Sequence, residues 1–296
     1  IASLAGTAHA GFTFAPGGIQ YSAGAKGSAG NSVVFHTYTG PDTIIGSSTF
    51  AGGFSALIPA TLPGEAAWNI RNTRFSVTSG ADFQMTRTGG GSGTILIAST
   101  PGAGMILRSG DILRFENFES FDDGPGADAA WTSVSWTFTD AVVTSLGTFS
   151  SVDSILTSGG IGPFGTDTEI GLYASDGTLI ASNDDFAGTA GSGFTGLGLV
   201  SGSYYLAVIP YDAGVAGDFA HSITSPGADG TGAYSLSING SIVASSLLSS
   251  RETEWYSFTV PAPGVASPML ALAFCRRRRD GASRPNATHR EASLRS

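Results

Sequence analysis

The run Trp131-Thr132-Ser133-Val134-Ser135-Trp136-Thr137-Phe138 decides the fold class of this chain. Its apolar residues Val134, Trp136 and Phe138 alternate with Ser and Thr, which is typical of a strand with one buried face. Similar strand patterns before residue 140 occupy 32–39, 74–78, 94–99 and 112–116. No window of ten or more residues between 11 and 260 places apolar residues at helical spacing, so the sequence predicts an all-β fold.

Glycine-rich segments separate these strands. Gly89-Gly90-Gly91-Ser92-Gly93 and Asp122-Asp123-Gly124-Pro125-Gly126 are turn or loop signals, and the chain of 296 residues contains 43 glycines. A chain of this length is typical of one large or two ordinary domains. We expect two β-sandwich or jelly-roll domains, 11–140 of unknown family and 141–260, followed by an unstructured or short-helical C-terminal tail.

The charge of the chain is unevenly distributed. Residues 1–264 hold 7 Lys and Arg against 21 Asp and Glu, whereas residues 265–296 hold 7 against 2. An acidic body repels phosphate backbones, so we expect no nucleic-acid partner. The single cysteine, Cys275, excludes an intrachain disulfide.

The first ten residues resemble the end of a secretion signal. Ala8-His9-Ala10 follows a small apolar stretch and has the A-x-A form of a signal-peptidase site. We therefore expect a signal peptidase to recognise Ala8 and Ala10 and to cut after Ala10, so that residues 1–10 are removed and the mature chain begins at Gly11. The alternative interpretation is an ordinary alanine-rich N-terminus.

The C-terminal region has three parts in a fixed order. Val260-Pro261-Ala262-Pro263-Gly264 is followed by an apolar run, 265–275, and then by Arg276-Arg277-Arg278-Arg279. This order resembles the PEP-CTERM sorting signal of bacterial surface proteins. The resemblance implies that 261–279 is held transiently in the inner membrane and cut near the Pro motif by an exosortase-type enzyme. Arginines beside an apolar segment stay on the cytoplasmic side.

Two observations on this tail allow other interpretations. The arginine run taken alone is also typical of a solvated charged segment or a nucleic-acid-binding arm. The apolar run has 11 residues where a spanning helix needs about 20. A frame error near Met269 would explain both this short run and the polar segment 280–296, which we expect to be disordered.

The second half contains an ordered series of short motifs. Asp167-Thr168-Glu169-Ile170-Gly171-Leu172-Tyr173 is followed by Ser175-Asp176-Gly177, Asn183-Asp184-Asp185, Gly202-Ser203-Tyr204-Tyr205-Leu206-Ala207-Val208 and Ala233-Tyr234-Ser235-Leu236-Ser237-Ile238. Asp-Gly between two apolar runs predicts a hairpin. The series resembles the pre-peptidase C-terminal (PPC) domain over about 146–239. The resemblance implies a jelly-roll β-sandwich of the kind that is an appendage on secreted enzymes and surface proteins, and it does not imply catalysis.

Catalytic motifs are scarce in this sequence. Between residues 11 and 264 the histidines are His36 and His221, and there is no Gly-x-Ser-x-Gly, His-Glu-x-x-His or P-loop motif. Gly191-Ser192-Gly193-Phe194-Thr195-Gly196 has the Gly-x-Gly-x-x-Gly form, but it precedes a strand, whereas a dinucleotide site must open a helix. We therefore predict that the chain is not an enzyme.

Calcium is the one cofactor for which the sequence offers candidate ligands. Asp167, Asn183, Asp184 and Asp185 flank the predicted hairpin, and oxygen donors from neighbouring loops suit Ca²⁺. The alternative is that these residues are turn formers that bond their own backbone. A second acidic group consists of Glu116, Glu119, Asp122 and Asp123.

The function predicted from these features is a structural or adhesive role at a bacterial cell surface or in extracellular matrix. The expected partners are the exosortase-type enzyme and exopolysaccharide or other envelope components. One alternative is a secreted hydrolase whose first domain holds paired carboxylates or His36 beside an acid. The other is a carbohydrate-binding module, for which Trp68, Trp131 and Tyr211 are the candidate stacking residues.

Overall fold

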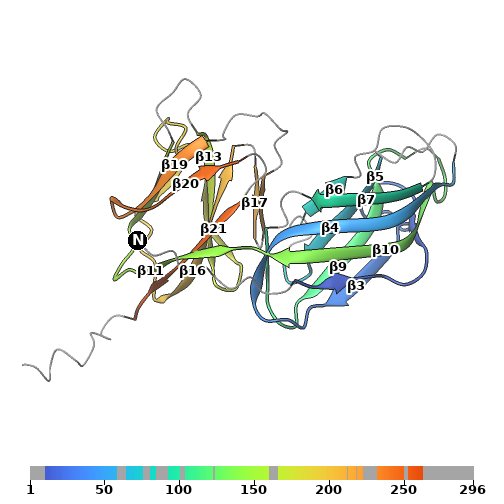
Figure 1. Ribbon diagram of the computed structural model, residues 1–296, viewed down its shortest axis with the longest axis horizontal. Helices are drawn as coiled ribbons and strands as arrows, with labels where there is room; N and C mark the ends of the chain where they lie inside the picture. Colours follow the sequence, from blue (N-terminus) through green and yellow to red (C-terminus); the bar gives the residue numbers. More distant parts are fainter. Residues whose placement is uncertain are drawn as a thin grey trace, which may run out of the picture.

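The computed structural model describes a chain built from strands (Figure 1). It describes residues 11–58, 65–75, 81–84, 93–100, 104–122, 124–159, 166–211, 213–217, 219–222, 232–249 and 253–262. None of these residues belongs to a helix, and their strands form four sheets. The all-β prediction is therefore confirmed.

The N-terminal half contains two facing sheets. The larger sheet contains β1 Thr13–Phe14, β2 Gln20–Ser22, β4 Thr43–Ala56, β7 Gly93–Thr100, β8 Met105–Leu107 and β10 Ala129–Asp140. The smaller sheet contains β3 Val33–Thr37, β9 Ile112–Glu119, β5 Ala66–Asn72 and β6 Ala81–Gln84. Buried Phe50 and Trp136 from the first sheet and Trp68 and Phe115 from the second belong to one core. The core therefore lies between the two sheets.

The strand that decides the fold class contains a β-bulge. Val134, Trp136 and Phe138 are buried as their alternation predicts, and Trp131 is buried as well. The register against β4 shifts between Thr132 and Ser135, and Ser133 between them has φ 52°. This extra residue resets the alternation, so that residues on both sides of the bulge face the core.

Strand β4 was not predicted from the sequence. Its 14 residues include the pair Gly52-Gly53, and glycine usually weakens a strand. A Cβ on Gly52 would lie 2.9 Å from the Phe50 ring and 3.3 Å from Trp131. The glycine therefore leaves space for two aromatic side chains on the inner face.

The predicted strand 74–78 is wrong at its first two residues. Arg74 and Phe75 lie in a turn after β5, and 76–78 fall outside the described residues. The Arg74 guanidinium binds the Asp111 carboxylate at 2.8 Å and contacts the carbonyl oxygen of Asp176. The N–H of Phe75 donates to the carbonyl of Asn72 at 3.2 Å, so the backbone forms a turn here and does not continue the strand.

The C-terminal half also contains two facing sheets. One contains β11 Val143–Thr148, β21 Glu254–Val260, β16 Gly202–Pro210, β13 Thr168–Ala174 and β14 Leu179–Asn183, in that order. The other contains β15 Gly193–Thr195, β12 Ser154–Gly159, β19 Gly232–Ile238 and β20 Ser241–Leu248. Leu172 and Leu206 from the first sheet and Ile155 and Leu236 from the second share a core.

Several strand predictions in this half are confirmed. Tyr204, Leu206 and Val208 face the core from β16. Strands β13 and β14 form the predicted hairpin, and Gly177 in its turn has φ +87°, which favours glycine. Residues 233–238 lie within β19.

The two halves are joined by a strand pairing and by a third buried cluster. The hairpin of β17 Ala213–Ala216 and β18 Phe219–Ser222 comes from the second half, but it joins the large sheet of the first. The N–H of Ala220 donates to the carbonyl of Gly104 at 2.9 Å. The third cluster contains Ile44, Ile106, Tyr173, Ala207, Ala220 and Trp255.

Candidate metal centre

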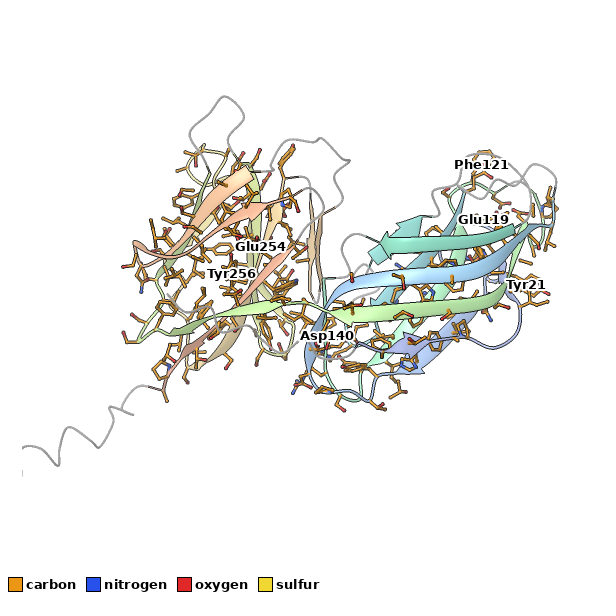
Figure 2. All side chains as sticks on the ribbon, in the orientation of Figure 1. Tyr21, Glu119, Phe121, Asp140, Glu254 and Tyr256 are labelled. Carbon is orange, nitrogen blue, oxygen red and sulfur yellow. The ribbon has the colours of Figure 1, made fainter. Side chains whose placement is uncertain are left out.

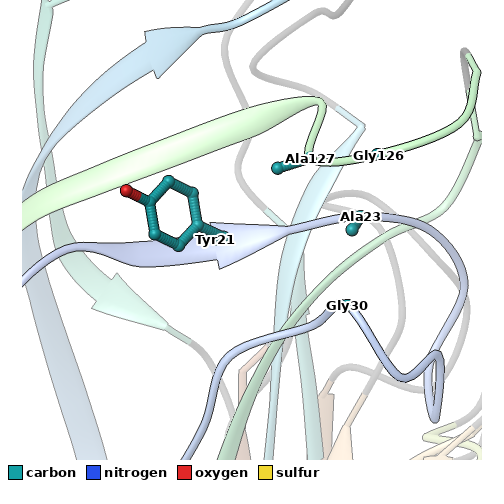
Figure 3. A pocket seen from close by; sticks show the side chains of 5 residues that line it. All are labelled: Tyr21, Ala23, Gly30, Gly126 and Ala127. Atoms are coloured by element: carbon teal, nitrogen blue, oxygen red, sulfur yellow. The ribbon is translucent and has the colours of Figure 1, made fainter.

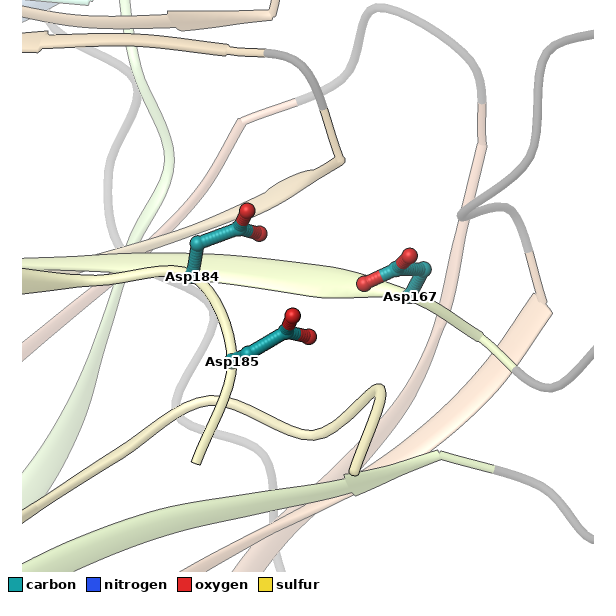
Figure 4. Close-up of side chains that lie close together, drawn as sticks. All are labelled: Asp167, Asp184 and Asp185. Carbon is teal, nitrogen blue, oxygen red and sulfur yellow. The ribbon is translucent and has the colours of Figure 1, made fainter. Parts of the chain in front are cut away.

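The hairpin β13–β14 brings three carboxylates together. Asp167 directly precedes β13, and Asp184 and Asp185 directly follow β14. In an antiparallel pair, one strand begins at the edge where the other ends. Asp167 before β13 therefore lies beside Asp184 and Asp185 after β14 (Figure 4). The backbone carbonyl of Asp167 also accepts from the N–H of Tyr211 at 3.0 Å, which fixes the start of the strand.

The spacing of these carboxylates is compatible with a shared cation. One oxygen from each of Asp167, Asp184 and Asp185 lies within 4.8 Å of the other two. Oxygen ligands about 2.4 Å from a common Ca²⁺ are separated by at most about 4.8 Å. Three carboxylates at this distance repel one another, and a divalent cation would relieve that repulsion. The donor set, hard oxygens alone, fits calcium.

Asn183 organises the loop that carries two of the carboxylates. Its Oδ1 accepts from the N–H of Gly193 at 2.8 Å, and its Nδ2 donates to the carbonyl of Asp185 at 3.2 Å. The structure thus brings together Asp167, Asp184 and Asp185, while Asn183 holds the backbone beside them, as the turn-former interpretation requires of this residue.

A buried set of hydroxyl groups beneath the loop was missed by the sequence reasoning. Thr157 Oγ1 and Thr168 Oγ1 lie 2.6 Å apart, and the hydroxyl of buried Ser192 contacts the carbonyl oxygens of Thr168 and Asp184. These hydroxyls tie β12, β13 and the loop after β14 together. Ser and Thr are so frequent in this chain that no sequence signal distinguishes them.

The second acidic group does not form one site. Glu116 and Glu119 lie on opposite faces of β9, because successive side chains of a strand alternate. Glu119 accepts from the Ser22 hydroxyl at 2.6 Å, and Asp122 accepts from the N–H of Gly124 at 3.0 Å. Asp123 lies outside the described residues.

Glu116 instead has a local structural role. Its carboxylate is buried and accepts from the Gly27 N–H, from Asn31 Nδ2 and from Arg114 Nη1 at 2.6, 3.0 and 2.7 Å. Burial alone would raise the pKa of Glu116, but these hydrogen bonds and the charge of Arg114 together lower it.

The histidines lie in separate strands. His36 in β3 stacks on Phe12, with ring centroids 5.3 Å apart, and lies 4.9 Å from the Phe14 ring. Burial lowers the pKa of His36. His221 lies in β18. The segment 191–196 enters β15, so its Gly-x-Gly-x-x-Gly pattern does not open a helix.

Two of the three candidate stacking residues are inaccessible to a sugar. Trp68 and Trp131 have no exposed surface, because they fill the core between the two sheets of the N-terminal half. Tyr211 is 44% exposed. An exposed aromatic that the sequence reasoning did not select is Tyr21, which lies beside Ala23, Gly30, Gly126 and Ala127 in an open hollow of about 440 Å³ (Figure 3).

The predicted signals at the two ends fall largely outside the described residues. Ala8, Ala10, Pro263, Gly264 and the arginines 276–279 are all outside them. Pro261 and Ala262 are described, and both are exposed directly after β21. Within the described residues there is no helix long and apolar enough to cross a membrane.

Comparisons with known proteins give little further information. No family model matches the sequence, and no curated protein matches it. The crystal structure of dimeric latent PorU from Porphyromonas gingivalis aligns with 65% of this chain and 19% of that chain, at 10% identity and a TM-score of 0.25. A likeness of this size carries no argument about the function of the chain.

Proposed function

We propose that this chain is a non-catalytic structural or adhesive protein of a bacterial cell surface or extracellular matrix, sorted through its C-terminal segment. In this proposal residues 11–140 and 141–260 are two β-sandwich domains of jelly-roll type, the second PPC-like. Separate cores between facing sheets in each half support that division. The separation is incomplete, because the hairpin β17–β18 extends the sheet of the first half.

The observation that carries the proposal is the exposed position of Pro261 and Ala262 directly after strand β21. Strand β21 lies between β11 and β16, and its last residue, Val260, is 4% exposed. Pro261 and Ala262 follow at once and are exposed. The Pro-Ala-Pro-Gly motif therefore starts directly beyond the folded body, where a processing enzyme can reach it without unfolding a strand.

Cell fractionation tests the sorting proposal. The full chain, with an epitope between Gly11 and Phe12 and another after Ser296, is expressed in a bacterium that carries an exosortase and in the same strain without it. We expect the second epitope to be lost and the first to reach the envelope or medium only in the strain with the enzyme. Pro261→Ala/Pro263→Ala should retain both epitopes, whereas the matched change Pro210→Ala should be cut normally. Retention of both epitopes in both strains would contradict the proposal.

We further propose that Asp167, Asp184 and Asp185 bind Ca²⁺ and stabilise the C-terminal half. The three convergent carboxylates support this proposal. A cation bound to the folded state alone stabilises it in proportion to the logarithm of its concentration, by about 2.7 kcal/mol at one hundred times Kd. The bound ion would hold the start of β13 and the end of β14 together.

Thermal unfolding in calcium and in EDTA tests this site. We expect millimolar Ca²⁺ to raise the Tm of the wild type and to leave that of Asp184→Asn/Asp185→Asn unchanged. Asp153→Asn, which removes an exposed carboxylate elsewhere in this half, is the matched control and should respond like the wild type. An unchanged wild-type Tm at millimolar Ca²⁺ would end the metal proposal without affecting the sorting proposal.

A further inference from the structure

A groove with both polar and apolar lining lies where the two halves of the molecule meet. It has a volume of about 410 Å³, and residues of both halves line it. On one side are the outward faces of β11, β21 and β16. The pairing registers place Ser145, Ser257 and Tyr205 in one row across these three strands. Ser203 and Thr259 are paired in the next row, so this wall presents mainly hydroxyl groups.

The opposite wall carries carboxylates from the N-terminal half. Asp42 and Asp140 line it, and Asp140 lies at the junction in Figure 2. The Asp42 carboxylate accepts from the N–H of Ser109 at 3.1 Å and lies 3.7 Å from Arg108 Nε. Burial and then the negative charge of Asp42 raise the pKa of Tyr205, and both side chains line the groove.

The walls of the groove are fixed before any ligand binds. Tyr205 packs against the cluster that joins the halves, which includes Ile44 and Trp255. The N–H of Ala141 donates to the carbonyl of Ile44 at 2.7 Å, so the segment that connects the halves is held against the first of them. A ligand that enters a preformed site avoids the entropic cost of ordering it.

The lining chemistry selects one class of ligand. Hydroxyl groups both donate and accept, carboxylates accept strong hydrogen bonds from hydroxyls, and a tyrosine ring presents an apolar face together with a polar tip. No Lys or Arg is among the lining residues, and two carboxylates disfavour an anion. We propose that this groove binds an uncharged saccharide, with Tyr205 as its aromatic contact and Asp42 and Asp140 as acceptors for sugar hydroxyls.

This inference rests on the proposed adhesive function and gives it a site and a substrate class. Affinity electrophoresis of the full chain in native gels cast with dextran, laminarin or galactomannan tests it, and alginate serves as an anionic polysaccharide. We expect retardation by at least one neutral polymer and weaker retardation by alginate. The binding should persist in EDTA, because the carboxylates contact the sugar directly.

Substitutions assign the binding to the groove. Tyr205→Ala should weaken the retardation by about tenfold or more, since a stacked ring and its hydrogen bond are lost. Asp42 is exposed, so Asp42→Asn should keep the fold. We expect this substitution to weaken the retardation by about fivefold. Tyr211→Ala, an exposed tyrosine outside the groove, should bind like the wild type.

Three results would overturn the inference. They are no retardation by any of the three neutral polymers, retardation unchanged in both Tyr205→Ala and Asp42→Asn, or loss of retardation in EDTA. The fractionation experiment above is independent of these measurements. Normal sorting without saccharide binding would remove the groove proposal alone, and binding without sorting would remove the surface role alone.

Discussion

The two halves of the molecule fill their cores with different side chains. In the N-terminal half, Trp131 and Trp136 surround Phe50, with ring centroids 5.2 and 4.8 Å from it. In the C-terminal half, the core is largely aliphatic, with Ile170 and Leu206 fully buried. A large ring fits only where the neighbouring backbone leaves space. Gly52, which has no Cβ, leaves this space beside Phe50 and Trp131. The core of the first half is therefore richer in aromatic side chains, and the core of the second half is richer in aliphatic ones.

The polar groups that anchor the two halves also differ. The first half uses the charged Glu116, which holds the segment around Gly27 and Asn31 over the outer face of β9. The second half uses two phenols that hydrogen-bond the Glu254 carboxylate. Tyr234 from one sheet and Tyr256 from the other both donate to Glu254, at 2.6 and 2.7 Å. Figure 2 labels Tyr256 and Glu254. We expect acid to weaken the first anchor and alkali to weaken the second.

Truncation of a core side chain should give the largest change in unfolding free energy, and the change should differ between the two halves. Trp136→Ala is expected to cost about 4 kcal/mol of unfolding free energy and Leu236→Ala about 3 kcal/mol, because the larger side chain leaves the larger cavity. Denaturant unfolding followed by far-UV circular dichroism measures both. Val200→Ala, at a side chain that is 75% exposed, is the control and should stay near wild type. Equal costs for the two core variants would remove the contrast between the cores.

Loss of Trp255 should uncouple the halves. This fully buried side chain belongs to the cluster shared by both, so Trp255→Ala is expected to cost about 3 kcal/mol and to split one calorimetric transition into two. Phe258→Ala truncates a side chain of the second core alone. It should lower the Tm but keep a single transition. A single transition in Trp255→Ala would show that the pairing of β18 with β8 is sufficient for coupling.

Acid should reveal the anchor of the first half. The folded pKa of Glu116 is lowered, so its contribution to stability is present above the unfolded pKa, about 4.3, and is lost as pH falls through the folded value. Glu116→Gln should cost about 2 kcal/mol at pH 7 and should flatten the acid limb of stability against pH. Asp153→Asn is the exposed control. If the stability of Glu116→Gln falls with decreasing pH as steeply as that of the wild type, this assignment is wrong.

Alkali should reveal the anchor of the second half. Burial, followed by hydrogen bonding, raises the pKa of Tyr234. Burial also raises the pKa of Tyr256; the hydrogen bond with Tyr234 opposes this shift, and the Glu254 carboxylate adds to it. The neutral phenols are thus favoured in the folded state, so stability is full below pH about 10, the unfolded pKa, and falls above it. Tyr256→Phe should cost about 1 kcal/mol at pH 7 and lessen the alkaline decline. Tyr211→Phe is the exposed control, and an identical decline in Tyr256→Phe would refute the anchor.

The parts of the candidate metal centre that could be predicted are those set by a single hairpin. Asp167 and Asp184 are close because the strands between them form an Asp-Gly hairpin, which is a local signal. The hydroxyl of Thr157 reaches the same place from β12, and that of Ser192 reaches it from the loop after β14. No local pattern encodes such a meeting, so the sequence could not predict it.

The sequence by itself determined the all-β class, the alternation of Val134, Trp136 and Phe138, and the hairpin of the second half, because these depend on periods and turns within a few residues. Only the tertiary structure decided the bulge at Ser133, the course of β4 through Gly52-Gly53, the addition of β18 to the sheet of the other half and the groove beside Tyr205. These features depend on which distant strands become neighbours. That choice follows from packing the whole chain around its cores and is absent from any local pattern.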